Sequence, residues 1–142
     1  MQALYNVKMA LEKQQKAELA AADRRLQELE RRLAQTAERI AFHRDAFNAQ
    51  VVEGINSTQL AVYQTGFRAL RETMEQQKEN IATAENEKKR IQAKLVLIMQ
   101  ERKMLESLRE KQWEEYKIES RMEETKTMED FLGAREAKKK AV

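Results

Sequence analysis

The sequence of 142 residues contains no cysteine and no proline, and it has only three glycines. Without cysteine the chain can form neither disulfide bonds nor thiolate sites, which is compatible with a reducing compartment. Without proline it lacks the strongest breaker of helices. The longest apolar run is LVLIM at 95–99, far below the roughly 20 residues that span a bilayer. The N-terminus shows no apolar segment of a signal peptide, so we expect a cytoplasmic protein.

Residues that carry chemistry are also scarce. His43 is the only histidine, and no second histidine or cysteine is available to complete a metal site. No glycine-rich phosphate loop is present. We interpret His43 as a packed or edge-exposed position of a helix and the many carboxylates as solvated helix surface. The sequence therefore predicts no enzyme, no cofactor and no metal.

Charged residues are abundant and of both signs. They make up 36% of the chain, yet the net charge is only +3. Acids and bases alternate along the chain, apart from KKR at 88–90 and KKK at 138–140. A nucleic-acid-binding protein usually gathers its bases on one face, so we expect no nucleic acid as a partner. This composition is typical of long helices and coiled coils.

Two segments show apolar or small residues at alternating steps of three and four, the pattern of a coiled-coil seam. The first seam consists of Leu19, Ala22, Leu26, Leu29, Leu33, Thr36, Ile40, His43 and Phe47. The second consists of Phe67, Leu70, Met74, Gln77, Ile81, Ala84, Lys88, Ile91, Leu95, Ile98, Arg102 and Leu105. We interpret Lys88 and Arg102 as residues whose alkyl stems pack while their charged ends reach solvent.

The stretch VEGINSTQL at 52–60 separates the two seams. Gly54 can adopt the left-handed conformation that ends a helix. Asn56 and Gln59 have the spacing of a capping box, and Ile55 and Leu60 stand at the staple positions on either side of Asn56. A helix that stops and restarts within a few residues predicts an antiparallel hairpin.

The two seams agree on one bend when facing residues have numbers that sum to about 113. Phe47 then faces Phe67, and Leu33 faces Ile81. In this register the first arm ends opposite residue 109 or 110, which leaves residues 111–132 without a partner in their own chain. This segment contains Trp113, Tyr116, Ile118, Met122, Met128, Phe131 and Leu132. Such a segment is either disordered or binds a partner outside its own chain, and we favour the partner.

The predicted fold class is all-α, a long two-helix antiparallel coiled-coil hairpin with an overhanging C-terminal helix. We expect a single coiled-coil domain over 1–142. Its first helix covers 1–53, its turn 54–56 and its second helix 57–132, followed by a flexible basic tail at 133–142 after Gly133.

Aromatic and branched side chains are concentrated near the bend: Phe42, Phe47, Val51, Val52, Tyr63 and Phe67. Phe42 stands two positions beyond the seam residue Ile40 and should point away from the seam. The cluster is either a second binding surface or a small hydrophobic cap that closes the end of the hairpin.

Three segments resemble the FliJ and YscO family of type III secretion stalk proteins. They are LYNVKMALEKQQKAELAAA near the N-terminus, YQTGFRALRETMEQQ after the bend and ESRMEETKTMEDFLGAR near the C-terminus. In the second segment, Tyr63, Phe67, Leu70, Met74 and Gln77 have the spacing of the family. In the third, the acidic residues and methionines of a helix end match it. Gly66 departs from the pattern, because a larger residue should pack better there.

The resemblance implies a central stalk subunit without enzymatic activity. Its paired terminal helices would enter the ring of the hexameric flagellar export ATPase and promote its assembly. The rest of the coil would reach the cytoplasmic domain of the export gate, and members also escort export chaperones. The protein would then lie at the cytoplasmic face of the inner membrane at the flagellar base, and it would touch the membrane only through the export apparatus.

The resemblance also implies two sets of contact residues. Candidates for the ATPase ring are Leu4, Val7, Trp113, Tyr116, Arg121, Met122, Met128 and Phe131. Candidates for the export gate are Phe42, Phe47, Val51, Tyr63 and Phe67. Three other interpretations stay open: an injectisome stalk of the same family, a homodimeric scaffold joined through 111–132, and a membrane or nucleic-acid binder that uses the basic tail.

Overall fold

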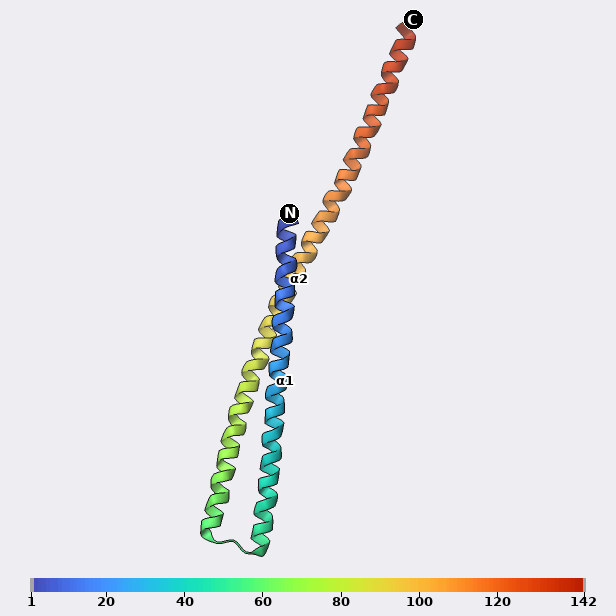
Figure 1. Cartoon of the computed structure of the whole chain (residues 1–142). Coiled ribbons are helices and arrows are strands. Elements are labelled where there is room, and N and C mark those ends of the chain that lie inside the picture. The colour runs from blue at the N-terminus through green and yellow to red at the C-terminus, as the bar shows by residue number, and fades with distance from the viewer. Residues whose placement is uncertain (1, 142) are drawn as a thin grey trace. The chain divides into compact units, whose positions relative to one another are not determined.

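The computed structural model describes residues 2–141, which form two helices and one turn. Helix α1 spans Gln2–Glu53 and helix α2 spans Ser57–Ala141 (Figure 1). No strand occurs among the described residues. The two long helices pack against each other, which confirms the predicted all-α hairpin.

The turn between α1 and α2 has the predicted chemistry. Gly54 has a φ of 105°, in the left-handed region that favours glycine. The Asn56 side chain accepts a hydrogen bond from the Gln59 backbone N–H at 2.8 Å, and the Asn56 N–H donates to Gln59 Oε1 at 3.2 Å. This reciprocal capping box lets α2 begin only three residues after α1 ends.

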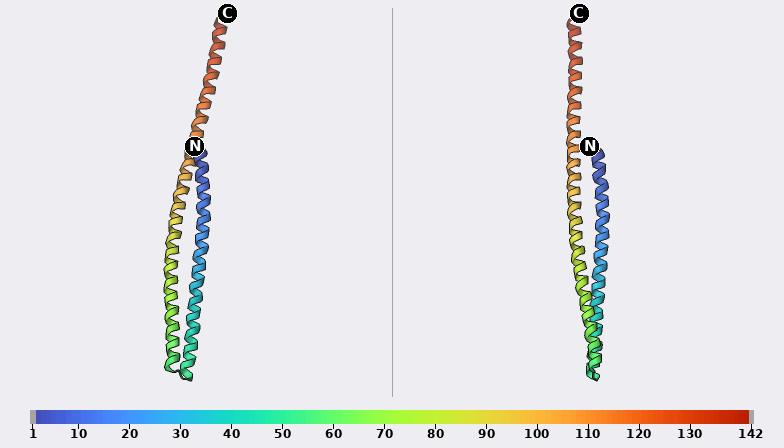
Figure 2. Two further views of the ribbon diagram at one scale, coloured as in Figure 1. Left: turned by 60° about the vertical axis from the view of Figure 1, so that its left-hand side comes forward. Right: turned by 90° about the vertical axis from the view of Figure 1, so that its left-hand side faces the viewer.

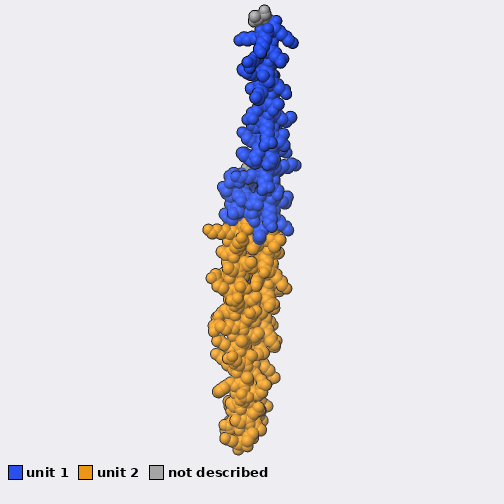
Figure 3. All heavy atoms as spheres, turned by 90° about the vertical axis from the view of Figure 1, so that its right-hand side faces the viewer, with its two compact units in different colours: residues 1–10, 98–142 blue, residues 11–97 orange. Residues whose placement is uncertain are grey.

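The chain divides into two compact units, shown in Figure 3. Unit 1 comprises the terminal segments, up to Ala10 and from Ile98 onward, and unit 2 comprises Leu11–Leu97. That the two units form a single domain stays a prediction.

Unit 2 is an antiparallel helical hairpin, and its two arms lie side by side in both views of Figure 2. Every predicted seam residue from Leu19 to Phe47 and from Phe67 to Leu95 is buried or half-buried. Few are fully buried: Leu26, Ala84 and Leu95 are 7–9% exposed, and Thr36 is 3% exposed. A two-helix hairpin buries only one stripe of each helix, so most of its surface stays in contact with water.

Lys88 occupies a seam position of unit 2 but does not simply extend into solvent. Its Nζ lies 2.8 Å from Oδ1 of Asp23 on the other arm. Both side chains are partly exposed, so the ion pair contributes at most about 1 kcal/mol. We therefore correct the interpretation of Lys88. Its alkyl stem packs in the seam, and its charged end pairs with Asp23 on the other arm instead of reaching solvent alone.

Gly66 is half-buried against His43, contrary to the expectation that a larger residue would pack better. A Cβ atom at position 66 would lie 2.7 Å from His43 Nε2, closer than side chains approach each other. Glycine fits here because the imidazole of His43 on the facing helix occupies the space that a Cβ atom would take. The helix α2 continues unbroken through this position.

In unit 1 the start of α1 packs beside the segment of α2 that begins at Ile98. The side chain of Ile98 is only 6% exposed. Tyr5 Oη donates a hydrogen bond to Glu106 at 3.0 Å, and Arg102 donates to the same carboxylate at 2.7 Å. Lys8 forms an ion pair with Glu101. Arg102 is half-buried, and its charged end pairs along its own helix rather than extending into solvent.

Beyond this contact α2 continues through the predicted helix end at 132 and the predicted flexible tail from Gly133, to Ala141. Gly133 does not have a positive φ, so it does not terminate the helix as Gly54 does. A glycine inside an exposed helix costs only about 1 kcal/mol. Good helix formers surround it, and Lys138, Lys139 and Lys140 stand in the last turn, where they interact favourably with the helix dipole.

Candidate partner-binding surfaces

The predicted contact residues of the unpaired segment are all exposed. From residue 107 to residue 140, every side chain except Lys117 and Ser120 is exposed. The large apolar ones are between 52% and 68% exposed: Trp113, Tyr116, Ile118, Met122, Met128, Phe131 and Leu132. Arg121 is also exposed. They lie around the helix rather than along one stripe, so a partner that covered them all would have to surround it.

Trp113 and Tyr116 contact each other on this surface. Their rings are stacked with centroids 5.7 Å apart and an interplanar angle of 21°. Lys117 Nζ lies 5.4 Å from the centre of the Trp113 ring, within cation–π range. Two aromatic rings and a cation one turn apart form a preorganised group that needs little further ordering to bind.

The other two ring candidates, Leu4 and Val7, lie on α1 and are 49% and 53% exposed. Tyr5 between them fixes this end of α1 to α2 through Glu106. The hydrogen bond to the Glu106 carboxylate raises the pKa of Tyr5 above its ordinary value of 10.0, and desolvation and the negative charge of Glu106 act in the same direction.

An open groove of about 700 Å³ borders Leu4 on α1 and the α2 segment that carries Met104, Leu105 and Leu108. It was not predicted from the sequence. Met104 and Leu108 are 70% and 45% exposed although they stand beside the seam residue Leu105. A second series of steps of four and three on α2 begins here with Met104 and Leu108 and reaches Ile118 and Met122, but the charged residues Lys111 and Glu115 interrupt it, which makes it a weak signal.

The predicted gate-side cluster separates into two parts in unit 2. Phe47, Tyr63 and Phe67 are half-buried and pack edge to face, with Phe47 5.3 Å from Tyr63 and 5.9 Å from Phe67. His43 joins them at 4.5 Å from the Phe67 ring and 5.1 Å from the Tyr63 ring. These four side chains form the hydrophobic cap that was one of the two interpretations.

The remaining members of the cluster face solvent. Phe42 is 78% exposed, Val51 is 48% exposed and Val52 is 87% exposed, while the nearby Val62 is 67% exposed. Phe42 therefore points away from the seam, as its spacing predicted. Of the gate candidates, only Phe42 and Val51 are exposed enough to offer a partner a substantial apolar surface.

Two other kinds of functional feature, a metal site and a membrane-spanning helix, are not found among the described residues. No group of three or more His, Cys, Asp or Glu side chains within 2–141 is arranged to hold a metal ion. Neither described helix contains a stretch long and apolar enough to cross a bilayer. The surfaces that remain for function are the exposed helix of unit 1, the groove and the exposed apolar residues of unit 2.

No curated protein and no solved structure matches the chain. A family model described as Flagellar FliJ protein matches residues 1–140, nearly the whole sequence. The chain belongs to this family of flagellar proteins, and its function is related to flagellar protein export.

Proposed function

We propose that the protein is a non-enzymatic central-stalk and coupling subunit of the flagellar type III export apparatus. In this proposal it inserts into the hexameric export ATPase ring, promotes ring assembly and links the ring to the export gate. The observation that supports it best is the exposed part of α2 in unit 1. A helix with Trp113, Tyr116, Met122, Met128 and Phe131 around its circumference suits a partner that encloses it.

The segment from residue 111 to 132 has a length that fits this role. At about 1.5 Å per residue it extends roughly 30 Å. Burial of its large apolar side chains would supply the driving force for insertion, at about 25 cal/mol per Å² of apolar surface removed from water. The ring contacts would then be Leu4, Val7 and the exposed side chains of α2.

The exposed apolar residues of unit 2 support a second contact, with the cytoplasmic domain of the export gate. We assign it to Phe42 and Val51, with Val52 and Val62 beside them, since these side chains face solvent. The hydrophobic cap, which includes Phe47, Tyr63 and Phe67, would hold the two helices together at this contact. Escort of export chaperones is a further role of the same proposal, and the position at the cytoplasmic face of the inner membrane follows from these contacts.

ATP turnover by the cognate flagellar export ATPase tests the ring contact. We expect the full chain to stimulate turnover and a chain that ends at residue 110 to fail. The double variant Phe42→Ala with Val51→Ala is the matched control and should stimulate as well as the wild type. If the full chain neither binds nor stimulates the ATPase, the stalk proposal is wrong, and a coiled-coil scaffold becomes the better explanation.

Binding to the gate domain tests the second contact with the same proteins in opposite roles. The Phe42→Ala and Val51→Ala double variant should lose most of its binding, whereas the chain that ends at residue 110 should keep it. Tyr63 is not a suitable probe, because its ring is part of the cap and its removal would disturb folding. Equal losses in both assays would contradict the assignment of two separate surfaces.

A further inference from the structure

The groove of unit 1 is lined by apolar side chains that water can reach. Four of them border it: Leu4, Met104, Leu105 and Leu108. Three are at least 45% exposed, and Leu105 is half-buried. The volume of the groove is about 700 Å³. Exposed apolar surface gathered in one concave place usually marks an interaction site.

The groove continues along α2 as a stripe of six residues at steps of four and three. They are Met104, Leu108, Lys111, Glu115, Ile118 and Met122. Such steps keep side chains on one face of a helix, the pattern by which helices pack in coiled coils. All six are exposed, whereas the seam residues Ile98, Arg102 and Leu105 beside them are buried or half-buried. The stripe is therefore a second packing face of α2, distinct from the face toward α1.

The order of residues along this stripe is self-complementary. From either end two apolar residues come first, and the two charged residues in the middle have opposite signs. When two copies of one helix pack antiparallel about a two-fold axis, the numbers of facing residues have a constant sum. A sum of 226 gives these facing pairs: Met104 with Met122, Leu108 with Ile118, and Lys111 with Glu115. Every layer of such a pair is either apolar or oppositely charged.

The stripe favours this one register. Because the layers of an antiparallel helix pair recur every seven residues, the neighbouring registers have sums of 219 and 233. In both of them Lys111 and Glu115 would face apolar residues of the second copy instead of each other. A charge that is buried without a partner is costly. A parallel pair in register would be worse, since each charge would face the same charge on the other copy.

The net charge of the groove also matches the segment that would lie in it. Three bases and one acid line the groove: Lys8, Lys103, Lys111 and Glu101. In the register above, residues 115–125 of the second copy lie along it, and they contain four acids and two bases. A lining of charge +2 thus meets a segment of charge −2. No ion pair within residues 2–141 involves Lys111 or Glu115, so both are available for this contact.

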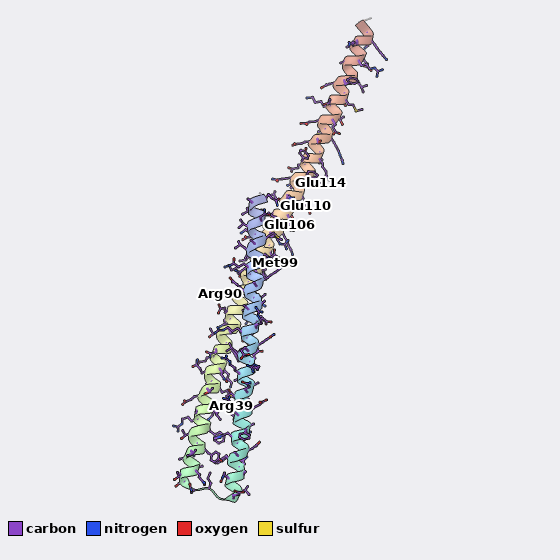
Figure 4. The ribbon with its side chains drawn as sticks, in the orientation of Figure 1. Arg39, Arg90, Met99, Glu106, Glu110 and Glu114 are labelled. Atoms are coloured by element: carbon purple, nitrogen blue, oxygen red, sulfur yellow. The ribbon has the colours of Figure 1, made fainter. Side chains whose placement is uncertain are left out.

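Other acids of this part of α2 lie off the stripe. Figure 4 labels three of them in succession along the helix: Glu106, Glu110 and Glu114. None of the three lines the groove. Glu106 accepts hydrogen bonds from Tyr5 and Arg102. Glu114 is nearest to the two-fold axis, and Lys117 of its own helix lies 3.7 Å from it, which reduces repulsion between the two copies.

We propose that two copies of this chain pair antiparallel through this stripe, so that residues 115–125 of each copy lie in the groove of the other. The interface is the same on both copies, as a two-fold axis requires. Each copy contributes four apolar side chains, and two contacts between Lys111 and Glu115 lie at the centre. The self-complementary order selects a second copy as the occupant, because an unrelated helix would place no such constraint on this sequence.

The pairing goes beyond the proposed function and meets it at one residue. Met122 belongs both to this stripe and to the proposed ring contact. A helix that a ring surrounds cannot at the same time lie against a second copy, so the two states exclude each other. Self-association would keep the exposed helix of unit 1 covered until a ring is available. This exclusion rests on the proposed function, whereas the pairing itself does not.

Analytical ultracentrifugation of the full chain from micromolar to millimolar concentration tests the pairing. We expect the wild type to show an equilibrium between monomer and dimer. Lys111→Glu would set acid against acid in both central contacts, and Glu115→Lys would set base against base. Each single variant should therefore dimerise about ten-fold more weakly or worse.

A mixture of the two single variants gives the most specific result. In a mixed dimer, one chain carries acids at 111 and 115 and the other carries bases at both positions, so that both central contacts are again between opposite charges. We expect the mixture to form dimers although neither variant does so alone. Both variants keep a net positive charge, so general attraction between them does not explain this result.

Two further variants locate the interface. Met104→Asp should weaken dimerisation by about ten-fold or more, because it places a charge opposite Met122 of the second copy. Lys126→Glu is the control for Lys111→Glu: it makes the same change of charge on an exposed residue of α2 but lies beyond the stripe. It should leave dimerisation unchanged. Circular dichroism of each variant checks that the helices are intact.

The measurement contains no ATPase, so its outcome is independent of ring insertion. A wild type that stays monomeric at every concentration would overturn the proposal. So would a dimer that Lys111→Glu and Lys126→Glu weaken equally, because its interface would then not be this stripe. A mixture of Lys111→Glu and Glu115→Lys that fails to form dimers would show that these two residues do not face each other, and the antiparallel register would be wrong.

Discussion

His43 of α1 lies directly against Gly66 of α2, so that a Cβ atom at position 66 would come within 2.7 Å of the imidazole Nε2. The same nitrogen lies 3.2 Å from the carbonyl oxygen of Tyr63. The pair joins the two arms of unit 2 at the hydrophobic cap that His43 forms with Phe47, Tyr63 and Phe67. A glycine in the middle of a helix is unfavourable by itself, and this contact explains why one stands there.

The pair should therefore show energetic coupling. Gly66→Ala in a His43→Ala background should stabilise the protein by about 1 kcal/mol, because alanine is the better helix former. In the presence of His43 the same change should destabilise it by about 1 kcal/mol or more, since the ring must be displaced. Urea unfolding followed by circular dichroism gives all four free energies of unfolding. Additive effects would contradict a direct contact.

Gly54 and Gly133 should respond in opposite ways to alanine. Gly54 has a φ of 105°, where an alanine is strained by about 1–2 kcal/mol, so Gly54→Ala should lower the free energy of unfolding by that amount. Gly133 lies inside α2, and no atom stands within 4 Å of the place that a Cβ would take. Gly133→Ala should therefore stabilise the helix by up to about 1 kcal/mol and raise the helical circular dichroism signal. Loss of stability in both variants would contradict a helical Gly133.

Seam position 88 should accept an apolar residue. Lys88→Leu removes the ion pair with Asp23, which contributes at most about 1 kcal/mol. It adds apolar burial in the seam, and we expect a net gain of about 1 kcal/mol in the free energy of unfolding. The neighbouring Lys89 is exposed, so Lys89→Leu serves as the control and should change stability by less than about 0.5 kcal/mol. A clear loss with Lys88→Leu would mean that the ion pair matters more than burial.

Tyr5 should make the terminal contact of unit 1 sensitive to alkaline pH. Its pKa is raised because its hydroxyl donates to Glu106, so the neutral form is the one that the folded state stabilises. This stabilisation is fully present below the ordinary pKa of 10.0 and is lost as the pH rises through the higher folded value. The tyrosinate absorbance of the wild type minus that of Tyr5→Phe should give a midpoint above 10.0.

Glu106→Gln provides the check on the cause. It removes the negative charge that opposes tyrosinate and weakens the acceptor of the hydrogen bond. The midpoint of Tyr5 should therefore move down toward its ordinary value. An unchanged midpoint would assign the shift to desolvation alone, against the hydrogen bond found between these residues.

Interactions between residues close together in the sequence made the two helices and the bend predictable. The steps of three and four place one face of each helix in the seam whatever else surrounds it, because the helical period is fixed. Gly54 and the Asn56–Gln59 capping box define the bend through interactions within a few residues. The all-α fold followed from these same patterns. Family membership was instead indicated by the resemblance of three segments, and the family model that matches residues 1–140 shows it.

Only the tertiary structure decided how residues that are distant in the sequence contact each other. The fit of His43 against Gly66, the pairing of Lys88 with Asp23 and the groove beside Leu4 depend on how side chains of two helices meet. A seam pattern predicts which face of a helix is buried, but it does not predict which side chain of one helix packs against which side chain of the other. The contrast between half-buried Phe47 and exposed Phe42 has the same origin, since exposure depends on the packed neighbour rather than on residue type.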